Sequence, residues 1–348
     1  MPRPNEPARD ADEFCREILP AVSRTFSLSI RVLPGELGHA VRDAYLLCRI
    51  ADTVEDEPRI PAEEKAALFD ALGACFRGAA DVRAFASLAA DLTGDPAHVR
   101  LVRNADLVFE SYRALPEPTR DAVSRWVGEM IRGMRKFALA YPGGVRIQSL
   151  EEYREYCYYV AGTVGYLVTD LWRQHAPSIG EREYQALRQR CRAFGEALQT
   201  VNILKDVARD AEHENSIYVP DDLLRACGSA HETILASNRA DANHAALGML
   251  VQLAWQDLEQ ATAYLLAIPR RAVAIRLCCA LPLLFAYATL RDLTKNPGAL
   301  GGARREVVKI SRSEVKSLTA LSVLGVLSNR MLARLVARTR ARPVVLGW

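Results

Sequence analysis

The chain has 348 residues, of which half are apolar and a quarter are charged, and its formal net charge at pH 7 is +3. This composition is typical of globular proteins and excludes disorder, collagen-like repeats and a small disulfide-rich scaffold. The near balance of charge argues against a dedicated nucleic-acid binder, because such proteins are usually strongly basic.

The eight cysteines are scattered along the chain, and only Cys278 and Cys279 are adjacent. None of them has the spacing of a zinc site. Residues 1–14 are polar and acidic, whereas a secretion signal would be basic and then apolar. We therefore expect reduced, buried thiols in a cytoplasmic protein.

Apolar residues recur at spacings of three and four along most of the chain, which predicts an all-α protein. The clearest stripes lie in residues 36–52 and 186–213. Proline and glycine separate the helical blocks at 33–35, 94–96, 141–144, 177–180, 219–220 and 296–298. Because no long linker or internal repeat divides the chain, we predict a single domain over 1–348.

Asp52, Glu55 and Asp56 form the first acidic cluster. On a helix with 3.6 residues per turn, these three carboxylates share one face. The apolar sequence at 44–51 precedes them, so the cluster borders a core. Carboxylates grouped beside a core need a counter-ion, and oxygen ligands suit Mg²⁺.

Asn202, Asp206 and Asp210 form a second polar line, because they follow one another at steps of four residues. Lys205 and Arg209 flank this line. Either cluster alone is typical of a solvated helix face. If the two lines face each other across a helical bundle, they predict bound Mg²⁺ ions and a diphosphate substrate. The apolar interior of such a bundle would shelter a hydrocarbon chain and a carbocation.

The C-terminal region is apolar over residues 317–333, but Asn329 and Arg330 interrupt this stretch. A membrane span needs about 20 uninterrupted apolar residues, so we expect none here. Residues 330–348 combine arginines with apolar residues. This basic tail has two interpretations: peripheral contact with an anionic membrane surface, or a packed helix followed by a solvated tail.

Four segments in order resemble the squalene/phytoene synthase family. DTVED at 52–56 is similar to the family's DxxED signature, and NILKDVARD at 202–210 is similar to its NxxxDxxxD signature. YCYYVAGTVG at 156–165 resembles the YCxYVAGxVG segment, and SRTF at 23–26 resembles SRSF. The resemblance implies an all-α isoprenoid-synthase helical bundle with a central cavity.

Under this resemblance, the motif-bearing core covers about 15–320 and the basic tail about 330–348. CALP at 279–282 and VKISR at 308–312 resemble the CAIP and VKIRK segments of the squalene-forming branch, and DTVED is closer to that branch than to the phytoene-type DELVD. The resemblance thus implies Mg²⁺-dependent joining of two farnesyl diphosphates to presqualene diphosphate, then NADPH-dependent reduction to squalene. The alternative is a dehydrosqualene or phytoene synthase, which needs no reductant.

The resemblance also implies roles for particular residues. The expected Mg²⁺ ligands are Asp52, Glu55, Asp56, Asn202, Asp206 and Asp210. The expected diphosphate-binding residues are Ser23, Arg24, Thr25, Arg49 and Lys205. The expected catalytic residues are Tyr156 as proton acceptor, Tyr45 lining the cavity, Asp52 and Asp206. The expected NADPH-binding residues are Lys309, Arg312, Asn202 and Arg49.

The chain departs from the family pattern at four positions. Lys205 stands where the family has Arg, and it lacks the bidentate fork that grips phosphate. Asn215 and Ser311 also replace arginines, one that contacts diphosphate in the family and one that contacts the nucleotide. Cys278 replaces the aromatic residue of animal enzymes, which affects the shielding of a cation.

A hypothesis from another functional class is a membrane-associated helical partner protein whose acidic lines are structural. The intact carboxylates at five positions argue against this hypothesis. We expect farnesyl diphosphate as substrate, no nucleic-acid partner, and a monomer that is cytoplasmic or peripherally bound to membrane.

Overall fold

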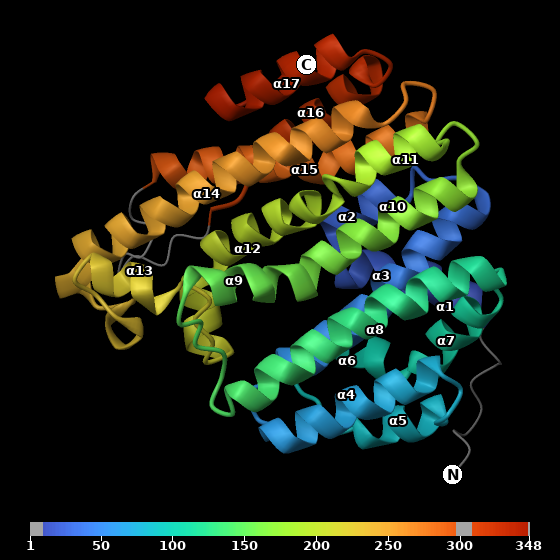
Figure 1. Ribbon diagram of the computed structural model, residues 1–348, viewed down its shortest axis with the longest axis horizontal. Helices are drawn as coiled ribbons and strands as arrows, with labels where there is room; N and C mark the ends of the chain where they lie inside the picture. The colour runs from blue at the N-terminus through green and yellow to red at the C-terminus, as the bar shows by residue number, and fades with distance from the viewer. Residues whose placement is uncertain (1–9, 297–307, 347–348) are drawn as a thin grey trace.

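The computed structural model describes residues 10–296 and 308–346, and these ranges contain no β-strand. They confirm the all-α prediction (Figure 1). The helices in the first half are α1 (Ala11–Val22), α2 (Arg24–Ile30), α3 (Gly35–Glu55), α4 (Ala62–Phe76), α5 (Val82–Leu88), α6 (Pro96–Arg103), α7 (Ala105–Arg113), α8 (Glu117–Ala140) and α9 (Leu150–Cys157). The remaining helices are the π-helical turn η1 (Tyr158–Gly162), α10 (Thr163–His175), α11 (Glu181–Arg188), α12 (Cys191–His213), α13 (Asp221–Ala226), the short 3-10 turns η2 (His231–Thr233) and η3 (Ser237–Arg239), α14 (Ala240–Ala267), α15 (Val273–Lys295), α16 (Arg312–Gly325) and α17 (Asn329–Ala341).

Local sequence signals start several of these helices. Ser23 caps α2 by accepting a hydrogen bond from the Phe26 amide, and Asp95 caps α6 through the Ala97 amide. Ser149 caps α9 in the same way. Each such cap stabilises its helix by about 1 kcal/mol.

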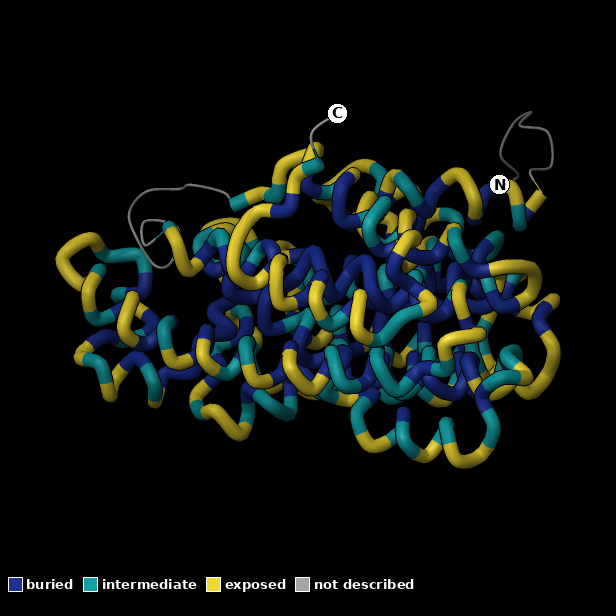
Figure 2. Tube along the Cα trace, turned by 90° about the horizontal axis from the view of Figure 1, so that it is seen from above, coloured by how far each residue is buried: buried dark blue, intermediate teal, exposed yellow. Residues whose placement is uncertain are grey.

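The long helices form one bundle in which α3, α8, α10, α12 and α15 surround the centre. Helix α8 packs against α3 and α10, and α12 packs against α10, α14 and α15. In Figure 1, α16 and α17 lie along the outer side of α14 and α15, and α4 and α5 lie at the opposite side of the molecule. Buried residues from Phe14 to Val344 form one connected apolar cluster. Figure 2 shows this buried core along the middle of the molecule and exposed residues around it. The single domain over 1–348 stays a prediction.

Two glycines, one in the YCYYVAGTVG segment and one on α12, let α12 approach η1 and α10 closely. A Cβ on Gly195 of α12 would collide with the carbonyl oxygen of Ala161, and one on Gly165 of α10 would collide with that of Cys191. The same segment contains the π-helical turn η1, and such turns are frequent at functional sites. The glycines therefore bring the second acidic motif up against η1.

The predicted stripe over 186–213 spans two helices rather than one. Helix α11 ends at Arg188, and α12 begins at Cys191 after a turn at 189–190. Leu187 and Cys191 are both fully buried. The apolar spacing continues across the turn because residues on either side of it contact the same core.

Helix α15 is the one described helix that is long and apolar enough to cross a membrane, and 78% of its most apolar window is buried inside the protein. The apolar stretch at 317–333 is not such a helix, as predicted, because a turn after Gly325 divides it between α16 and α17. The cysteines are free, as predicted, and all of them are buried except the half-buried Cys227.

The basic tail is not simply solvated. Most of it forms α17, whose Leu332, Leu335 and Val336 are buried. Beyond α17, Val344 is fully buried, and its amide donates a hydrogen bond to Glu314 at 2.9 Å.

Candidate active site

Two cavities meet between the acidic motifs. One is polar, has a volume of about 810 Å³ and is lined by both motifs. The other is mainly apolar, with a volume of about 180 Å³. Five residues line both: Arg49, Asp52, Val160, Gln199 and Asn202. A molecule with a charged head and an apolar chain can therefore span the junction.

The first acidic cluster lies at the C-terminal end of α3. Asp52, Glu55 and Asp56 all line the polar cavity, as their shared helix face predicts. Asp56 is the C-terminal cap of α3 and keeps helical backbone angles. Apolar residues of the same helix, including Val41 and Cys48, line the apolar cavity.

The second acidic line lies on α12 and faces the same polar cavity. Asn202, Asp206 and Asp210 line it, and Asp56 of α3 lies close enough to Asp210 to disfavour its ionisation. Glu214 continues the four-residue step by one more turn and also lines the cavity. The structure thus brings the two predicted motifs together.

Burial and mutual repulsion make these carboxylates reluctant to ionise. Burial raises the pKa of Asp52 to about 6, with a further contribution from Asp56. Burial, Glu214, Asp206 and Asp56 raise the pKa of Asp210 to about 8. Burial and Asp56 raise the pKa of Glu214 to about 7. For Glu55, burial and its two acidic neighbours raise the pKa well above the usual value. A cation in the cavity would relieve this repulsion.

Cations border the acidic groups. Arg49 lies 3.4 Å from Asp52, and its Nη2 donates to the Tyr45 hydroxyl at 3.3 Å. Burial opposes the charge on Arg49, but Asp52 and Tyr45 outweigh it and raise its pKa. Lys205 pairs with Asp206 at 3.1 Å, and Arg209 lies 3.5 Å from Glu214.

The two predicted tyrosines lie in different parts of the site. Tyr156 lines the polar cavity, stacks on Tyr218 with ring centroids 4.8 Å apart, and directs its hydroxyl to Glu55 at 3.5 Å. Burial and Glu55 raise the pKa of Tyr156. Tyr45 lines the apolar cavity, where its ring centroid lies 5.4 Å from that of Phe26.

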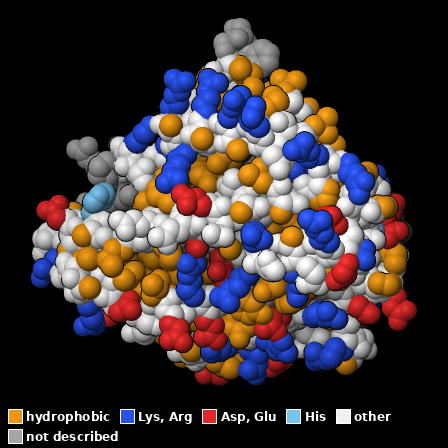
Figure 3. All heavy atoms as spheres, turned by 45° about the horizontal axis from the view of Figure 1, so that its top comes forward, with side chains coloured by type: hydrophobic (Ala, Val, Ile, Leu, Met, Phe, Trp, Pro, Cys, Tyr) orange, Lys and Arg blue, Asp and Glu red, His pale blue; other side chains and the backbone are white. Residues whose placement is uncertain are grey.

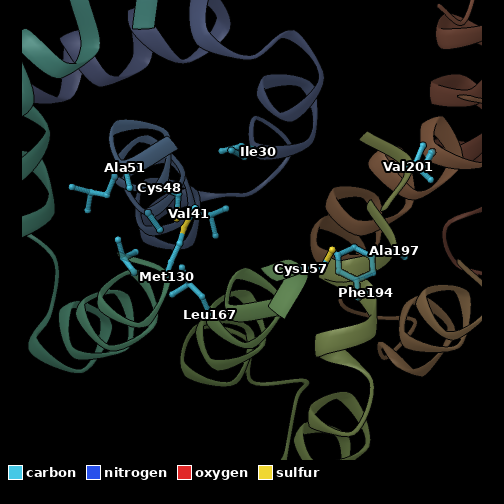
Figure 4. Packing of buried hydrophobic residues seen from close by; sticks show 14 of the residues in the cluster. Ile30, Val41, Cys48, Ala51, Met130, Cys157, Leu167, Phe194, Ala197 and Val201 are labelled. Atoms are coloured by element: carbon cyan, nitrogen blue, oxygen red, sulfur yellow. The ribbon is translucent and has the colours of Figure 1, made fainter. Parts of the chain in front are cut away.

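The apolar cavity is built from six segments of the chain. Its walls come from α2, α3, α8, η1 with α10, α12 and α15. Figure 4 shows Val41 and Cys48 of α3 beside Met130 of α8 and Leu167 of α10, all of which line this cavity. Cys278 and Cys279 close the α15 side.

The residues at 23–25 do not line either cavity, contrary to what a direct diphosphate contact would require in this state. Ser23 caps α2, and Arg24 and Thr25 are exposed. They are nevertheless close to the site, because His98 of the polar cavity lies 3.4 Å from the carbonyl oxygen of Val22.

Lys309 and Arg312 also lie outside the lining of both cavities. Both side chains are exposed, while Val308 and Ile310 pack against the core. Ser311 caps α16 by accepting from the Glu314 amide at 3.1 Å. The predicted nucleotide-phosphate residues are thus surface residues that the described chain does not join to the acidic motifs.

Several residues of the polar cavity were absent from the sequence prediction. Glu214 carried a signal, since it extends the four-residue step of the second motif. His98 and Tyr218 carried none, because His98 comes from α6 and Tyr218 from the loop after α12, and tertiary packing alone brings them to the cavity. Arg146 donates hydrogen bonds to both the carbonyl and the side chain of Asn215, so a cation does lie beside the position where the family has arginine.

The donor set of the polar cavity fits Mg²⁺. This ion takes one or two protein carboxylates, keeps several waters and shares substrate phosphates. Across the described residues, no three Asp, Glu, His or Cys side chains form a complete metal-binding group. The buried Oε1 of Glu55 has no hydrogen-bond partner, and a cation or its water would satisfy it.

The chain matches one known family by sequence and several solved structures by fold. Residues 19–314 match the family described as squalene/phytoene synthase. The chain is 27% identical to squalene synthase 1 of Arabidopsis thaliana over 301 residues, which are 86% of this chain and 68% of that protein. It is 28% identical to squalene synthase of Schizosaccharomyces pombe over 287 residues, which are 81% of this chain and 60% of that protein. The solved structure of TcSQS with the ligand BPH1237 shares the fold, with a TM-score of 0.79, 24% identity, and coverage of 96% of this chain and 92% of that one.

Proposed function

Because the chain belongs to the squalene/phytoene synthase family, we propose that it joins two farnesyl diphosphates head to head and reduces the product to squalene. The observation that carries this proposal is the junction of the two cavities. Two acidic lines face the polar cavity, and the apolar cavity begins at Asp52 and Asn202 between them. The relatives named squalene synthase support the choice of substrate and product.

Diphosphate would bind at the polar end. Asp52, Glu55, Asp56, Asp206 and Asp210, with Asn202, would hold Mg²⁺. When bound, Mg²⁺ neutralises the charge that develops on a leaving diphosphate. Arg49 and Lys205 would bind diphosphate oxygens directly, where a fixed cation is most effective. Ser23, Arg24 and Thr25 would close over the diphosphate from the start of α2.

The farnesyl chain would lie in the apolar cavity. Loss of the first diphosphate leaves an allylic cation, and joining it to the second chain gives presqualene diphosphate. The apolar walls exclude water, which would otherwise quench the cation. Tyr45 and Phe26 present aromatic rings to this space, and an aromatic face attracts a cation.

Tyr156 would accept the proton lost during cyclopropane formation. Its hydroxyl faces Glu55 at 3.5 Å. A tyrosine oxygen that takes up this proton can therefore release its own proton to the Glu55 carboxylate. Glu55 accepts this proton only in its ionised form, which a cation bound in the cavity would favour against its raised pKa.

The reductive half of the reaction rests on the resemblance to the squalene-forming branch. NADPH would supply the hydride, with Lys309 and Arg312 at its phosphate and Arg49 and Asn202 at the junction. Since Lys309 and Arg312 line neither cavity, a dehydrosqualene or phytoene synthase without reductant is the second candidate function. We also propose that the protein is a cytoplasmic monomer that contacts membrane peripherally.

The first test is Mg²⁺-dependent binding of inorganic pyrophosphate, measured by calorimetry. We expect Asp52→Asn and Asp206→Asn each to weaken this binding by about 100-fold, because each removes an anionic ligand. Glu212→Gln is the control, since Glu212 lies on α12 but outside the cavity lining. Unchanged binding in both site variants would favour a helical scaffold protein instead.

A further inference from the structure

The turn between α16 and α17 exposes large apolar side chains at its tip. Val323 is 55% exposed, Leu324 72%, Leu327 61% and Met331 48%. Single exposed apolar residues are common on proteins, but a group of four around one turn indicates an interaction surface. We call these four residues the apolar tip.

The apolar tip is held in a fixed position by a buried arginine. Arg276 of α15 is completely buried and donates hydrogen bonds at 2.7 Å to the carbonyl oxygen of Val326 and to Oδ1 of Asn329. Asn329 in turn donates to the carbonyl oxygen of Leu266 at 3.1 Å. Charge-assisted hydrogen bonds of this kind are strong. These hydrogen bonds fix the turn between α16 and α17, so the apolar tip is held in its exposed position.

The sequence around the apolar tip is wholly free of acidic residues. No Asp or Glu occurs in residues 315–348, which carry six Lys and Arg, or in residues 260–291. Arg330, Arg334 and Arg338 lie at steps of four on the exposed face of α17. Figure 3 shows a row of basic side chains beside hydrophobic ones over this part of the molecule.

A second basic group lies in the connection between α14 and α15, a few residues before Arg276. Arg270 and Arg271 are exposed there, immediately before α15, and Val273 beside them is 36% exposed. Two short segments that are far apart in sequence thus present apolar and cationic side chains together.

We infer that this surface docks on an anionic phospholipid bilayer. Leu324, Leu327 and Met331 would enter the boundary between headgroups and acyl chains, and the arginines would contact lipid phosphates. Peripheral membrane sites combine these two features: an apolar insertion and cations at headgroup level. The projecting apolar tip supplies the insertion, and the flanking arginines supply the cations that complement an anionic headgroup layer.

The described residues after α17, 342–346, are not the docking element. Val344 is buried, and the amide of Leu346 donates to Ser317 at 2.9 Å, so this end of the chain is tied to α16. Within the basic tail, the proposed membrane contact therefore lies on α17, beside the apolar tip.

The surface lies near one end of the apolar cavity. Val273 precedes the cavity residue Cys278 by five positions on α15, about 7.5 Å of helix. A water-insoluble hydrocarbon product would thus leave close to lipid. This consequence rests on the proposed function, whereas the docking surface itself does not.

The test is sedimentation of the full chain with phosphatidylcholine vesicles that contain phosphatidylglycerol, compared with pure phosphatidylcholine, without substrate or Mg²⁺. We expect binding to the anionic vesicles only. Arg330→Gln with Arg334→Gln should weaken it by about 30-fold, from the attraction of two arginines to an anionic surface. Leu324→Ser with Leu327→Ser should weaken it by about tenfold or more.

The matched controls are Arg83→Gln and Leu88→Ser on α5, which replace an 81% exposed arginine side chain and a 61% exposed leucine at the opposite side of the molecule (Figure 1). They should bind like the wild type. Leu324→Trp provides a second measurement, since the emission of an inserted indole shifts to shorter wavelength.

The inference is overturned if the wild type does not sediment with anionic vesicles, or if both double variants bind as the wild type does. It is also overturned if Leu324→Trp emission does not change on adding vesicles. Because no substrate is present, a failed product assay would contradict the proposed function and leave this result standing.

Discussion

Glu214 is one residue that raises the pKa of neighbouring carboxyl groups in the site, among them Asp210. It lines the polar cavity. The negative charges of Glu214 and Asp56 repel each other, so each group makes the other harder to ionise. Replacing it with Gln removes that charge and keeps the shape of the side chain. If Glu214 helps to attract the metal, we expect Glu214→Gln to lower the apparent affinity for Mg²⁺ about tenfold.

Titration of Mg²⁺ against pyrophosphate release measures this effect, with Glu212→Gln as the control on the same helix. An unchanged Mg²⁺ requirement would show that Glu214 only repels Asp56 and does not assist metal binding.

The acidic motifs were predictable because their spacing alone places them on one helix face. Asp52 and Asp56 of α3, and Asp206 and Asp210 of α12, line one cavity as expected. Tyr218 could not be found in this way, since its position depends on the loop after α12 packing against Tyr156. The helical pattern carries no information about such loop contacts.

At the scale of elements, the close approach of α12 to η1 depends on glycine. A Cβ on Gly195 would collide with the backbone carbonyl of Ala161, which cannot move without shifting η1. We expect Gly195→Ala to lower the free energy of unfolding by about 1–3 kcal/mol. Urea unfolding measures this change.

Gly248→Ala on α14 is the control, because a Cβ there meets nothing within 4 Å. Alanine should stabilise this helix by up to about 1 kcal/mol. If both variants were stabilised alike, the close approach of α12 to η1 would not be a constraint on the fold.

The presence of a helix was easier to predict than the place where a helix is interrupted. Residues 36–52 form part of α3 as expected, with Val41, Tyr45 and Cys48 on the cavity face. The stripe over 186–213 contains a turn at 189–190, and no proline or glycine in the sequence marks it. Apolar spacing reports which side faces the core, and that side is the same before and after the turn.

At the scale of the whole molecule, the acidic cavity makes stability depend on pH. The pKa of Asp52 is raised to about 6, that of Glu214 to about 7 and that of Asp210 to about 8. In the unfolded chain, these groups titrate near pH 4. Folding therefore favours their protonated forms, and the resulting stability is lost progressively as the pH rises from about 4 to about 8.

We expect the metal-free protein, treated with a chelator, to melt at a lower temperature at about pH 8 than at about pH 6. Mg²⁺ should raise the melting temperature more at the higher pH, where it competes with fewer protons. Asp210→Asn should reduce the pH dependence. Greater stability of the metal-free chain at the higher pH would contradict the raised pKa values.

The fold and the acidic side of the site follow from the sequence, whereas the proposed nucleotide side does not. Lys309 and Arg312 follow a family segment, yet both are exposed and outside the cavities. Short basic segments have no periodicity that ties them to a cavity. The choice between a reducing and a non-reducing enzyme therefore needs a direct measurement.

That measurement is the product formed by the purified chain from farnesyl diphosphate and Mg²⁺, with and without NADPH. We predict squalene only when NADPH is present, and accumulation of presqualene diphosphate when it is absent. Asp206→Asn should abolish both products. Dehydrosqualene in both reactions would contradict the reductive step, and no consumption of farnesyl diphosphate in either would contradict the proposed function.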